Sequence, residues 1–560
     1  MFAVDERVLS NWRKNTGSEI PARPLARHGG CVVQTSGAPM ITEDQSRVVA
    51  FLGSPTAHAG AAVERIDTHT SVVFLAGERA WKLKRAVRYD YLDYSTADRR
   101  RAMCDAEVRI NRRTAPALYL GVTPVTQEGD GSLAIGGAGT PVDWLVEMAR
   151  FEQTALLDRQ VEAGGLPLEL MAPLAHAIAQ CHRSADSRIG RGGWDAMRRV
   201  IDGNADGFAK EACGILDPIT CARWTERARF VLDRGGPLLD GRRDDGMVRQ
   251  CHGDLHLRNV VVLNGLPTLF DAIEFNDDIA SIDVLYDLAF LLMDLWRLGL
   301  RQHANVLWNA YLAETVDLDG VALMPLFLSC RAAVAAKTTA TTAHLQPDAD
   351  RRATLQVRAR DYLTLAAALL EPPPPHLIAV GGLSGSGKST LARALAPSIG
   401  AAPGAVVIRS DQIRKRLCGV KPTDHLGPDG YADDVSRRVY ATVMNHADTV
   451  VRGGVAAVAD AVFAAPADRD AIEEVARAAG VAFTGLWLEA PVPVRLSRVA
   501  ARVADASDAD VEVIRRQLTH PLDGLRWPRL DASGTRRQVC DHAAAIVGRD
   551  RCSFVGSSLV

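Results

Sequence analysis

The sequence lacks paired cysteines. Its ten cysteines lie singly along 560 residues without a CxxC pair, so we do not expect a structural zinc site. A chain of this length can bury a core without disulfides, and reduced cytoplasmic thiols are the simpler interpretation.

The sequence also has little net charge and no long hydrophobic run. Its formal net charge of -2 gives no general basic field for nucleic acid or an anionic membrane. The longest apolar stretch, around Leu288–Met293, is bounded by Asp287 and Asp294. It is too short and too charged to span a bilayer. With 47% hydrophobic and 24% charged residues, the composition is that of a globular protein with more than one domain.

The first forty residues lack the apolar segment of a signal peptide. They show no helical or strand period, so we expect a disordered tail over residues 1–40. After Met40, Thr42 and Gln45 have the spacing of a capping box before an apolar-periodic segment. A flexible native tail and translation that begins at or near Met40 fit this pattern equally well.

Four consecutive prolines, Pro372–Pro375, divide the chain, because proline stiffens the backbone and cannot continue a helix. An Ala-rich helical pattern over Arg331–Leu370 precedes them. We predict one body over 41–370, a linker over 371–376, a second body over 377–548 and a C-terminal tail over 549–560. Both bodies mix strands with helices, and we expect them to fold separately.

The second body begins with an apolar strand, Leu377–Val380, followed by a glycine-rich loop and a helical stretch. This is the Walker A pattern, in which backbone N–H groups and the helix dipole bind phosphate. Lys388 is expected to reach the β- and γ-phosphates, and Ser389 to hold Mg²⁺. The predicted nucleotide-binding residues are Gly382, Leu383, Ser384, Gly385, Ser386, Gly387, Lys388, Ser389 and Thr390.

Two further apolar strands of this body end in carboxylates, Asp411 and Asp460. Carboxyl ends of strands in an open α/β sheet lie beside the phosphate site. Asp460 takes the place of a Walker B carboxylate that supports Mg²⁺. No glutamate follows it, which favours a kinase over a motor ATPase.

The Ser410-Asp411-x-x-Arg414 string resembles that of P-loop kinases acting on small molecules and polynucleotide ends. This resemblance implies that Asp411 is the general base and that Arg414 binds an anion of the substrate. Asp411 as a helix cap is the structural alternative. The resemblance also implies a phosphate-binding lid that carries Arg498 and Arg502, with Arg495 on the same helix face. A solvated basic face is the alternative there.

The first body contains His252-Gly-Asp254-Leu-His-Leu-Arg-Asn259, in which Asp and Asn have the spacing of a kinase catalytic loop. A hairpin over 260–270 leads from this loop to Asp271. The string resembles that of aminoglycoside and choline or fructosamine phosphotransferases. This resemblance implies that Asp254 is catalytic and that Asn259 and Asp271 bind Mg²⁺.

In this family a glycine follows the second metal-binding aspartate, but Ala272-Ile-Glu274 follows it here, so Glu274 is a further metal candidate. Asp283 and Asp287 are interpreted as structural.

A small nucleotide-binding lobe is expected upstream. Ser71–Leu75 and Arg79–Lys84 form a predicted hairpin that places Lys82 and Lys84 on one face. We prefer Lys82 as the phosphate-binding lysine, with Glu107 as its ion-pair partner. Leu145–Met148 resembles the hinge strand that contacts adenine. Asp67–Ser71 stands where protein kinases have a glycine-rich loop.

As a whole, the chain resembles bacterial proteins in which an aminoglycoside phosphotransferase-like domain precedes a P-loop kinase-like domain. The predicted fold class is α/β and α+β, with a bilobal protein-kinase-like domain and a doubly wound parallel sheet. The implied function is an ATP-dependent kinase with two Mg²⁺-ATP sites and small-molecule acceptors, located in the cytoplasm. A regulatory pseudokinase domain, or an ATP-binding switch without an acceptor, are the alternatives.

Overall fold

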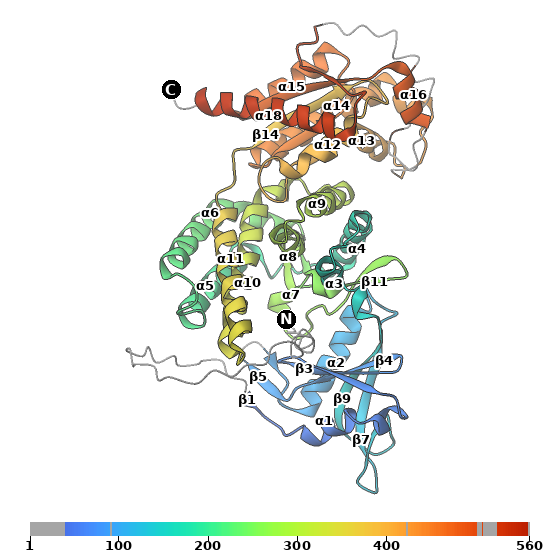
Figure 1. Ribbon diagram of the computed structural model, residues 1–560, viewed down its shortest axis with the longest axis vertical. Helices are drawn as coiled ribbons and strands as arrows, with labels where there is room; N and C mark the ends of the chain where they lie inside the picture. Colours follow the sequence, from blue (N-terminus) through green and yellow to red (C-terminus); the bar gives the residue numbers. More distant parts are fainter. Residues whose placement is uncertain are drawn as a thin grey trace, which may run out of the picture.

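The computed structural model describes residues 40–89, 92–421, 424–500, 507, 514 and 524–557. Except for Met40, the predicted N-terminal tail lies outside these residues. Figure 1 shows three successive layers along the long axis: a sheet-containing lobe, a helical lobe and a second α/β body. The chain passes between the last two at the prolines, where α11 ends at Leu369 and β14 begins at His376.

The first lobe contains a six-stranded antiparallel sheet. Its order is β2-β3-β4-β9-β7-β8: β2 (Val63–Asp67), β3 (Ser71–Ala76), β4 (Arg79–Lys84), β9 (Thr140–Ala149), β7 (Tyr119–Gln127) and β8 (Leu133–Ile135). Helix α2 (Ala97–Asn111) packs on β7 and β9, and the Thr96 hydroxyl caps it by accepting from Arg99 N–H. The predicted β3–β4 hairpin and the hinge strand in β9 are both present.

Smaller elements at the start of this lobe are β1 (Met40–Ile41), α1 (Ser46–Leu52), β5 (Val87–Tyr89) and β6 (Leu92–Asp93). The predicted capping box is wrong. Gln45 precedes α1 without a side-chain cap. Thr42 Oγ1 donates to Ala86 O and Ser95 O instead, and Gln45 bonds Lys84 O and Ala86 N. Long-range partners therefore take both polar side chains away from the helix end.

The second lobe is helical. Its main helices are α3 (Leu157–Glu162), α4 (Met171–Ser184), α5 (Gly193–Lys210), α6 (Pro218–Asp244), α8 (Val284–Arg297), α9 (Arg301–Thr315), α10 (Met324–Leu345) and α11 (Ala349–Leu369). Two short antiparallel pairs hold the catalytic-loop string: β10 (Val248–Gln250) with β13 (Ser281–Asp283), and β11 (Val260–Leu263) with β12 (Leu266–Leu269). The helical pattern predicted over Arg331–Leu370 is divided between α10 and α11, which pack on each other.

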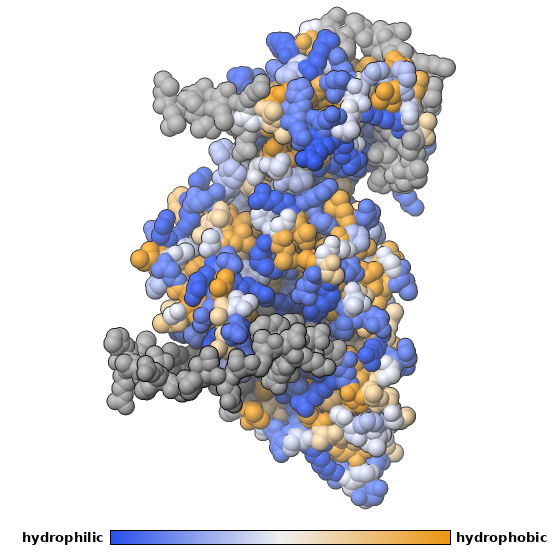
Figure 2. All heavy atoms as spheres, in the orientation of Figure 1, coloured by the Kyte–Doolittle hydropathy of each residue, from blue (hydrophilic) through white to orange (hydrophobic). Residues whose placement is uncertain are grey.

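One described helical stretch, Asp319–Leu345, is long and apolar enough to cross a membrane, but 78% of its most apolar window is buried inside the protein. It is longer than Leu288–Met293, the apolar stretch identified from the sequence, which lies in α8. Because it packs between α8 and α11, its apolar character is that of a core helix. On the face in Figure 2, polar residues are interspersed with apolar ones over this lobe.

The C-terminal body is a five-stranded parallel sheet of order β15-β16-β14-β17-β18. The strands are β14 (His376–Gly382), β15 (Val406–Arg409), β16 (Ala457–Asp460), β17 (Ala482–Glu489) and β18 (Arg529–Asp531). The helices are α12 (Lys388–Leu395), α13 (Ser410–Leu417), α14 (Asp433–Arg452), α15 (Pro466–Ala479), α16 (Val492–Ala500) and α18 (Arg536–Ser557).

Alternate residues of β14 face two different cores. Leu377 and Ala379 join the core that includes α14 and α15, whereas Ile378 and Val380 pack with α12 and α18. The sheet is therefore covered on both faces, as expected of a doubly wound fold. Helix α18 continues to Ser557, so the segment predicted as a C-terminal tail from residue 549 is largely helical.

The two bodies share a polar contact at the edge strand β15. Asn309 Oδ1 accepts from Val407 N–H at 2.7 Å, and Asn305 and Asn309 each donate to Ala405 O at 3.1 Å. Both asparagines belong to α9, and Asn305 is 2% exposed. They satisfy backbone N–H and C=O groups at the edge of the sheet. On an exposed edge strand, such groups can pair with another chain and cause aggregation. Separate folding of the two bodies stays a prediction, but separation would uncover this edge.

We predict that Asn309→Ala will speed amide exchange at residues 404–410 on the order of fivefold, because Val407 N–H loses its acceptor. Hydrogen-exchange mass spectrometry of the full chain measures this. Asn309→Asp is the matched control, since it keeps an acceptor oxygen and should retain most of the protection. Equal exchange in the wild type and Asn309→Ala would show that the contact does not hold the strand.

Candidate functional site

The P-loop connects β14 to α12. Gly387, with φ of 103°, precedes the first helical residue, Lys388. Gly385 has φ of 82°, and a Cβ there would lie 2.7 Å from Arg495 O. Glycine is required at Gly385 both for its left-handed backbone and for the approach of α16. The loop therefore leaves its amide groups and a helix N-terminus together for phosphate.

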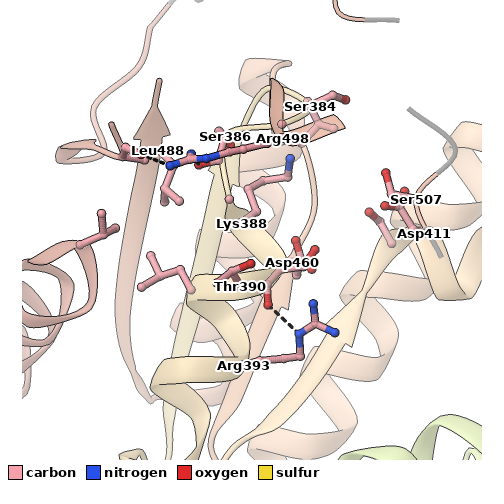
Figure 3. A pocket seen from close by; sticks show the side chains of 18 of the residues that line it. Ser384, Ser386, Lys388, Thr390, Arg393, Asp411, Asp460, Leu488, Arg498 and Ser507 are labelled. Carbon is pink, nitrogen blue, oxygen red and sulfur yellow. Dashed lines mark hydrogen bonds between the residues drawn. The ribbon is translucent and has the colours of Figure 1, made fainter. Parts of the chain in front are cut away.

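The loop forms one wall of a cavity of about 640 Å³, a size typical of small-ligand sites. Seven of the nine predicted P-loop residues, Ser384 to Thr390, line this cavity, and Gly382 ends the preceding strand β14. In the view of Figure 3, Lys388 lies between Arg498 and Asp411. Asp411, Arg414, Asp460 and Arg498 line the same cavity, so the structure brings these predicted residues together.

Asp411 lies in the first turn of α13, whose cap position is Arg409. Asp411 is therefore not the N-cap residue of α13. Its carboxylate in the first turn still complements the helix dipole. Burial raises the pKa of the Asp411 carboxyl, Asp460 raises it further, and Lys388 and Arg409 oppose this. A carboxylate with a raised pKa at the cavity wall is suited to accept a proton.

Arg414 is 8% exposed and donates to Gly430 O at 2.8 Å and Ser436 Oγ at 3.2 Å. Its guanidinium also lies 4.7 Å from the centre of the Tyr431 ring. These contacts use one nitrogen and one face of the group, while Arg414 and Tyr431 both line the cavity. Arg414 therefore has a structural role in addition to its predicted one.

The predicted lid arginines differ in position. Arg498 donates to Ser386 O at 3.1 Å and to Ala532 O at 2.7 Å, so it lies against the P-loop as expected. Arg495 is buried and donates to Ser384 O at 2.8 Å. It supports the loop backbone and is not part of a solvated face. Arg502 lies outside the described residues.

Asp460 ends β16, the strand next to β14. Its Oδ2 lies 3.3 Å from Arg409 Nε, and Arg409 Nη2 donates to Ser389 Oγ at 3.2 Å. Carboxylate and hydroxyl oxygens are the ligands that Mg²⁺ prefers. Asp460 and Ser389 therefore fit a magnesium ion chemically, although an arginine from this chain lies beside both.

The first body has a second cluster of charged residues between its lobes. Lys82 Nζ lies 2.8 Å from Glu107 Oε1 and 2.6 Å from Asp271 Oδ1. Lys84 Nζ lies 2.5 Å from both Glu107 Oε2 and Glu274 Oε1. The Lys82 side chain is 16% exposed and that of Lys84 is 1% exposed. The structure therefore supports the choice of Lys82 as the lysine that faces the site.

Glu274 is not placed as a metal ligand. Its Oε1 accepts from Lys84 and from Tyr94 Oη at 2.7 Å. Burial alone would lower the pKa of the Lys84 ammonium, but Glu107 and Glu274 raise it overall. Glu274 is thus the counter-charge of a buried lysine, a role that a glycine could not fill.

Asp271 fits the predicted role of metal ligand better than Glu274 does. Its φ is 61°, and its N–H donates to Tyr119 Oη at 3.0 Å. Burial alone would raise the pKa of the Asp271 carboxyl, but the Lys82 ammonium lowers it overall, while the charge of Asp254 opposes that effect. The Asp254 carboxylate thus adds negative charge at this position to that of Asp271.

The catalytic-loop string lies between β10 and β11. Asn259 Nδ2 donates to Asp254 O at 2.9 Å and to Asp254 Oδ2 at 3.2 Å. His256 Nε2 lies 3.4 Å from the same carboxylate oxygen. The structure thus joins Asp254 and Asn259 directly, and the carboxylates of Asp254 and Asp271 with the Asn259 amide oxygen offer oxygen ligands for Mg²⁺.

Asp287 holds the catalytic loop through its backbone. Its two oxygens accept from His252 N–H at 3.1 Å and Gly253 N–H at 2.8 Å. His182 and Cys251 lie close enough to Asp287 to form a metal-binding group. Both oxygens of this fully buried carboxylate already accept hydrogen bonds from the loop, so we assign Asp287 a structural role. Asp283 pairs with Arg242 at 2.7 Å. Both aspartates are structural, as the sequence predicted.

A family model described as an AAA domain matches residues 377–521. The uncharacterized proteins Rv2004c of Mycobacterium tuberculosis and Mb2027c of Mycobacterium bovis are each 30% identical to this chain over 490 residues. The alignment covers 85% of this chain and 94% of each relative.

This chain belongs to the same family as those mycobacterial proteins. An alignment of 490 residues takes in parts of both bodies, so the family shares the two-part organisation.

Among solved structures, a choline/ethanolamine kinase family protein from Mesorhizobium loti is 16% identical and has a TM-score of 0.36. It covers 58% of this chain and 95% of its own. A gluconokinase from Sinorhizobium meliloti 1021 is 21% identical with a TM-score of 0.25, over 33% of this chain and 98% of its own. The two separate main sheets of the structure confirm the predicted two-domain fold class, and the family model matches the predicted second body.

Sequence reasoning missed Arg409, the support of the P-loop by Arg495, and the far wall of the cavity. That wall includes Tyr431, Tyr440, Arg536 and Cys540. The position of Arg409, directly before Ser410-Asp411 at a strand end, was the available signal. Tyr440 of α14 and Arg536 of α18 follow no local motif, and only the tertiary fold brings them to the same cavity.

We predict different effects for Asp254→Asn and Asp271→Asn, each made in a full chain whose P-loop is disabled by Lys388→Ala. Asp254→Asn removes the group that orients the acceptor hydroxyl and should cut phosphoryl transfer on the order of 10² or more, with nucleotide affinity little changed. Asp271→Asn removes a charge that would hold Mg²⁺ against phosphates and should also weaken Mg²⁺-ATP binding.

Nucleotide titration with and without Mg²⁺, beside turnover, separates these effects. Transfer at the normal rate in Asp254→Asn would contradict its role. No Mg²⁺-dependent ATP binding in the Lys388→Ala parent would contradict a nucleotide site in the first body.

Proposed function

We propose that this protein is an ATP-dependent phosphotransferase with two Mg²⁺-ATP sites, each of which transfers the γ-phosphoryl group to a hydroxyl of a small-molecule acceptor. The observation that carries the proposal is the shared cavity of Lys388, Asp411 and Arg414. A phosphate-binding lysine, a carboxylate that can accept a proton and an arginine line one space. An ATP-binding switch without an acceptor would not need Asp411 and Arg414 there.

In the proposed P-loop reaction, an acceptor oxygen attacks the γ-phosphorus while the bond from that phosphorus to the ADP oxygen breaks. The acceptor proton passes to Asp411. Lys388, the loop amides and Arg498 would balance the charge on the phosphate oxygens. When bound, Mg²⁺ supplies further charge neutralisation, and Ser389 and Asp460 would hold it. Arg414 would bind an anionic or oxygen-rich part of the acceptor.

In the first body, Lys82 would bind ATP phosphates and Glu107 would position the lysine. Asp254 would orient the acceptor hydroxyl, and Asn259 and Asp271 would hold Mg²⁺. Eight described cysteines are free thiols, which is consistent with work in the cytoplasm, where ATP is present. We expect neither nucleic acid nor a membrane as a partner.

A regulatory role for the first body is the second candidate. The turn from β2 to β3 lacks glycine, and Thr68 holds it closed by two hydrogen bonds with Ser71. Arg85 ties the same turn through Thr68 O at 2.7 Å. A turn fixed in this way adapts less to phosphates than a glycine-rich loop. The direct Lys82–Asp271 contact also has to open before phosphates can bind.

A phosphate-transfer screen of the full chain against a metabolite library tests the proposal. Lys388→Ala should abolish transfer to acceptors of the P-loop site, because the phosphate contact is lost while the fold is retained. Asp411→Asn should lower kcat on the order of 10² with the KM for ATP little changed. Lys421→Ala, an exposed lysine of the same body outside the cavity, is the matched control.

Turnover by folded Lys388→Ala equal to that of the Lys421→Ala control would exclude the P-loop as the active site. Normal kcat in Asp411→Asn would remove its role as base.

A further inference from the structure

Arg409 is the last residue of β15 and stands in register with Asp460, the last residue of the neighbouring strand β16. It is 7% exposed. Its Nε lies 3.3 Å from Asp460 Oδ2, and its Nη2 lies 3.2 Å from Ser389 Oγ. The guanidinium therefore contacts both residues that fit the magnesium ion of the P-loop.

Arg409 also acts on a second carboxylate at this edge, that of Asp411. Its charge lowers the pKa of Asp411, against the stronger opposite effects of burial and Asp460. Arginine stays protonated at all relevant pH values. The oxygen ligands at this edge of the sheet thus face a permanent positive charge contributed by the chain itself.

A divalent cation that enters beside a fixed guanidinium meets strong repulsion, because few water molecules screen charges in a buried site. ATP changes this balance, since its phosphates bring several negative charges to the same edge. The Lys388 ammonium, which lies in the same cavity, adds to the positive field that phosphates compensate.

We propose that Arg409 is a resident counter-ion that keeps free divalent cations out of the P-loop metal site until nucleotide phosphates arrive. The proposal rests on the proposed Mg²⁺-ATP site and makes metal entry there conditional on nucleotide. Arg409 acts through Asp460 and Ser389 and is therefore a positioning residue. A purely structural tie between β15 and β16 would predict lower stability on mutation, but no new metal binding.

Titration of the nucleotide-free full chain with Mn²⁺, followed by the paramagnetic resonance of free Mn²⁺, tests this directly. Arg409→Gln should bind Mn²⁺ at least about tenfold more tightly than the wild type, because a charge next to the ligands is removed. Arg409→Lys keeps the charge and should remain close to the wild type. Adding Asp460→Asn to Arg409→Gln should remove the gain, which assigns it to this site.

Arg393→Gln is the matched control. Arg393 lines the same cavity and carries the same charge, but donates to the backbone Ser389 O at 3.1 Å. It should not produce the gain. Circular dichroism confirms that each variant is folded before its Mn²⁺ binding is compared with that of the wild type.

Unchanged or weaker Mn²⁺ binding in folded Arg409→Gln would overturn the proposal, and so would an equal gain in Arg393→Gln. Nucleotide titration of the same samples separates this from the proposed function. ATP binding without an Mn²⁺ gain leaves the phosphotransferase proposal standing and removes the role of Arg409. An Mn²⁺ gain in a chain that binds no ATP would contradict the proposed function and would overturn the nucleotide-dependent part of the role of Arg409.

Discussion

The pairing of buried charges is the constraint on which both candidate sites depend. An ion removed from water is costly unless an opposite charge or several hydrogen bonds accompany it. Glu107 accompanies two lysines, Arg409 accompanies Asp460, and Asp287 accepts from two backbone amides beneath the catalytic loop. Each of these pairs joins separate elements of the chain, so the same contacts that position the sites also hold the lobes and strands together.

The buried charges are paired differently in the two sites. In the first body, Lys82 contacts Asp271 directly, so a phosphate-binding group and a metal-binding group neutralise each other. In the P-loop body, Arg409 takes the corresponding place beside Asp460 and Ser389. In both, nucleotide and metal together would replace internal partners with external ones. Such exchange allows a buried polar site to exist without ligand and still bind one.

Local motifs carried most of the sequence prediction. The P-loop, the β3–β4 hairpin and the Asp254–Asn259 spacing depend on residues close in sequence, so turn chemistry and strand alternation were sufficient to find them. Glu274 and the Thr42–Gln45 pair were misread because their partners, Lys84 and Ala86, are distant in sequence. The Arg409 contact and the Asn309 contact with β15 depend on which strands become neighbours and which helix covers the edge. No spacing rule gives that information.

In the proposed function, one chain holds two nucleotide sites, one in each body. Calorimetric titration of the full chain with Mg²⁺ and a non-hydrolysable ATP analogue measures their number directly. We predict two nucleotides bound per wild-type chain, one after Lys388→Ala, and one after Lys82→Ala. A single nucleotide per chain that disappears with Lys388→Ala and is unaffected by Lys82→Ala would contradict it.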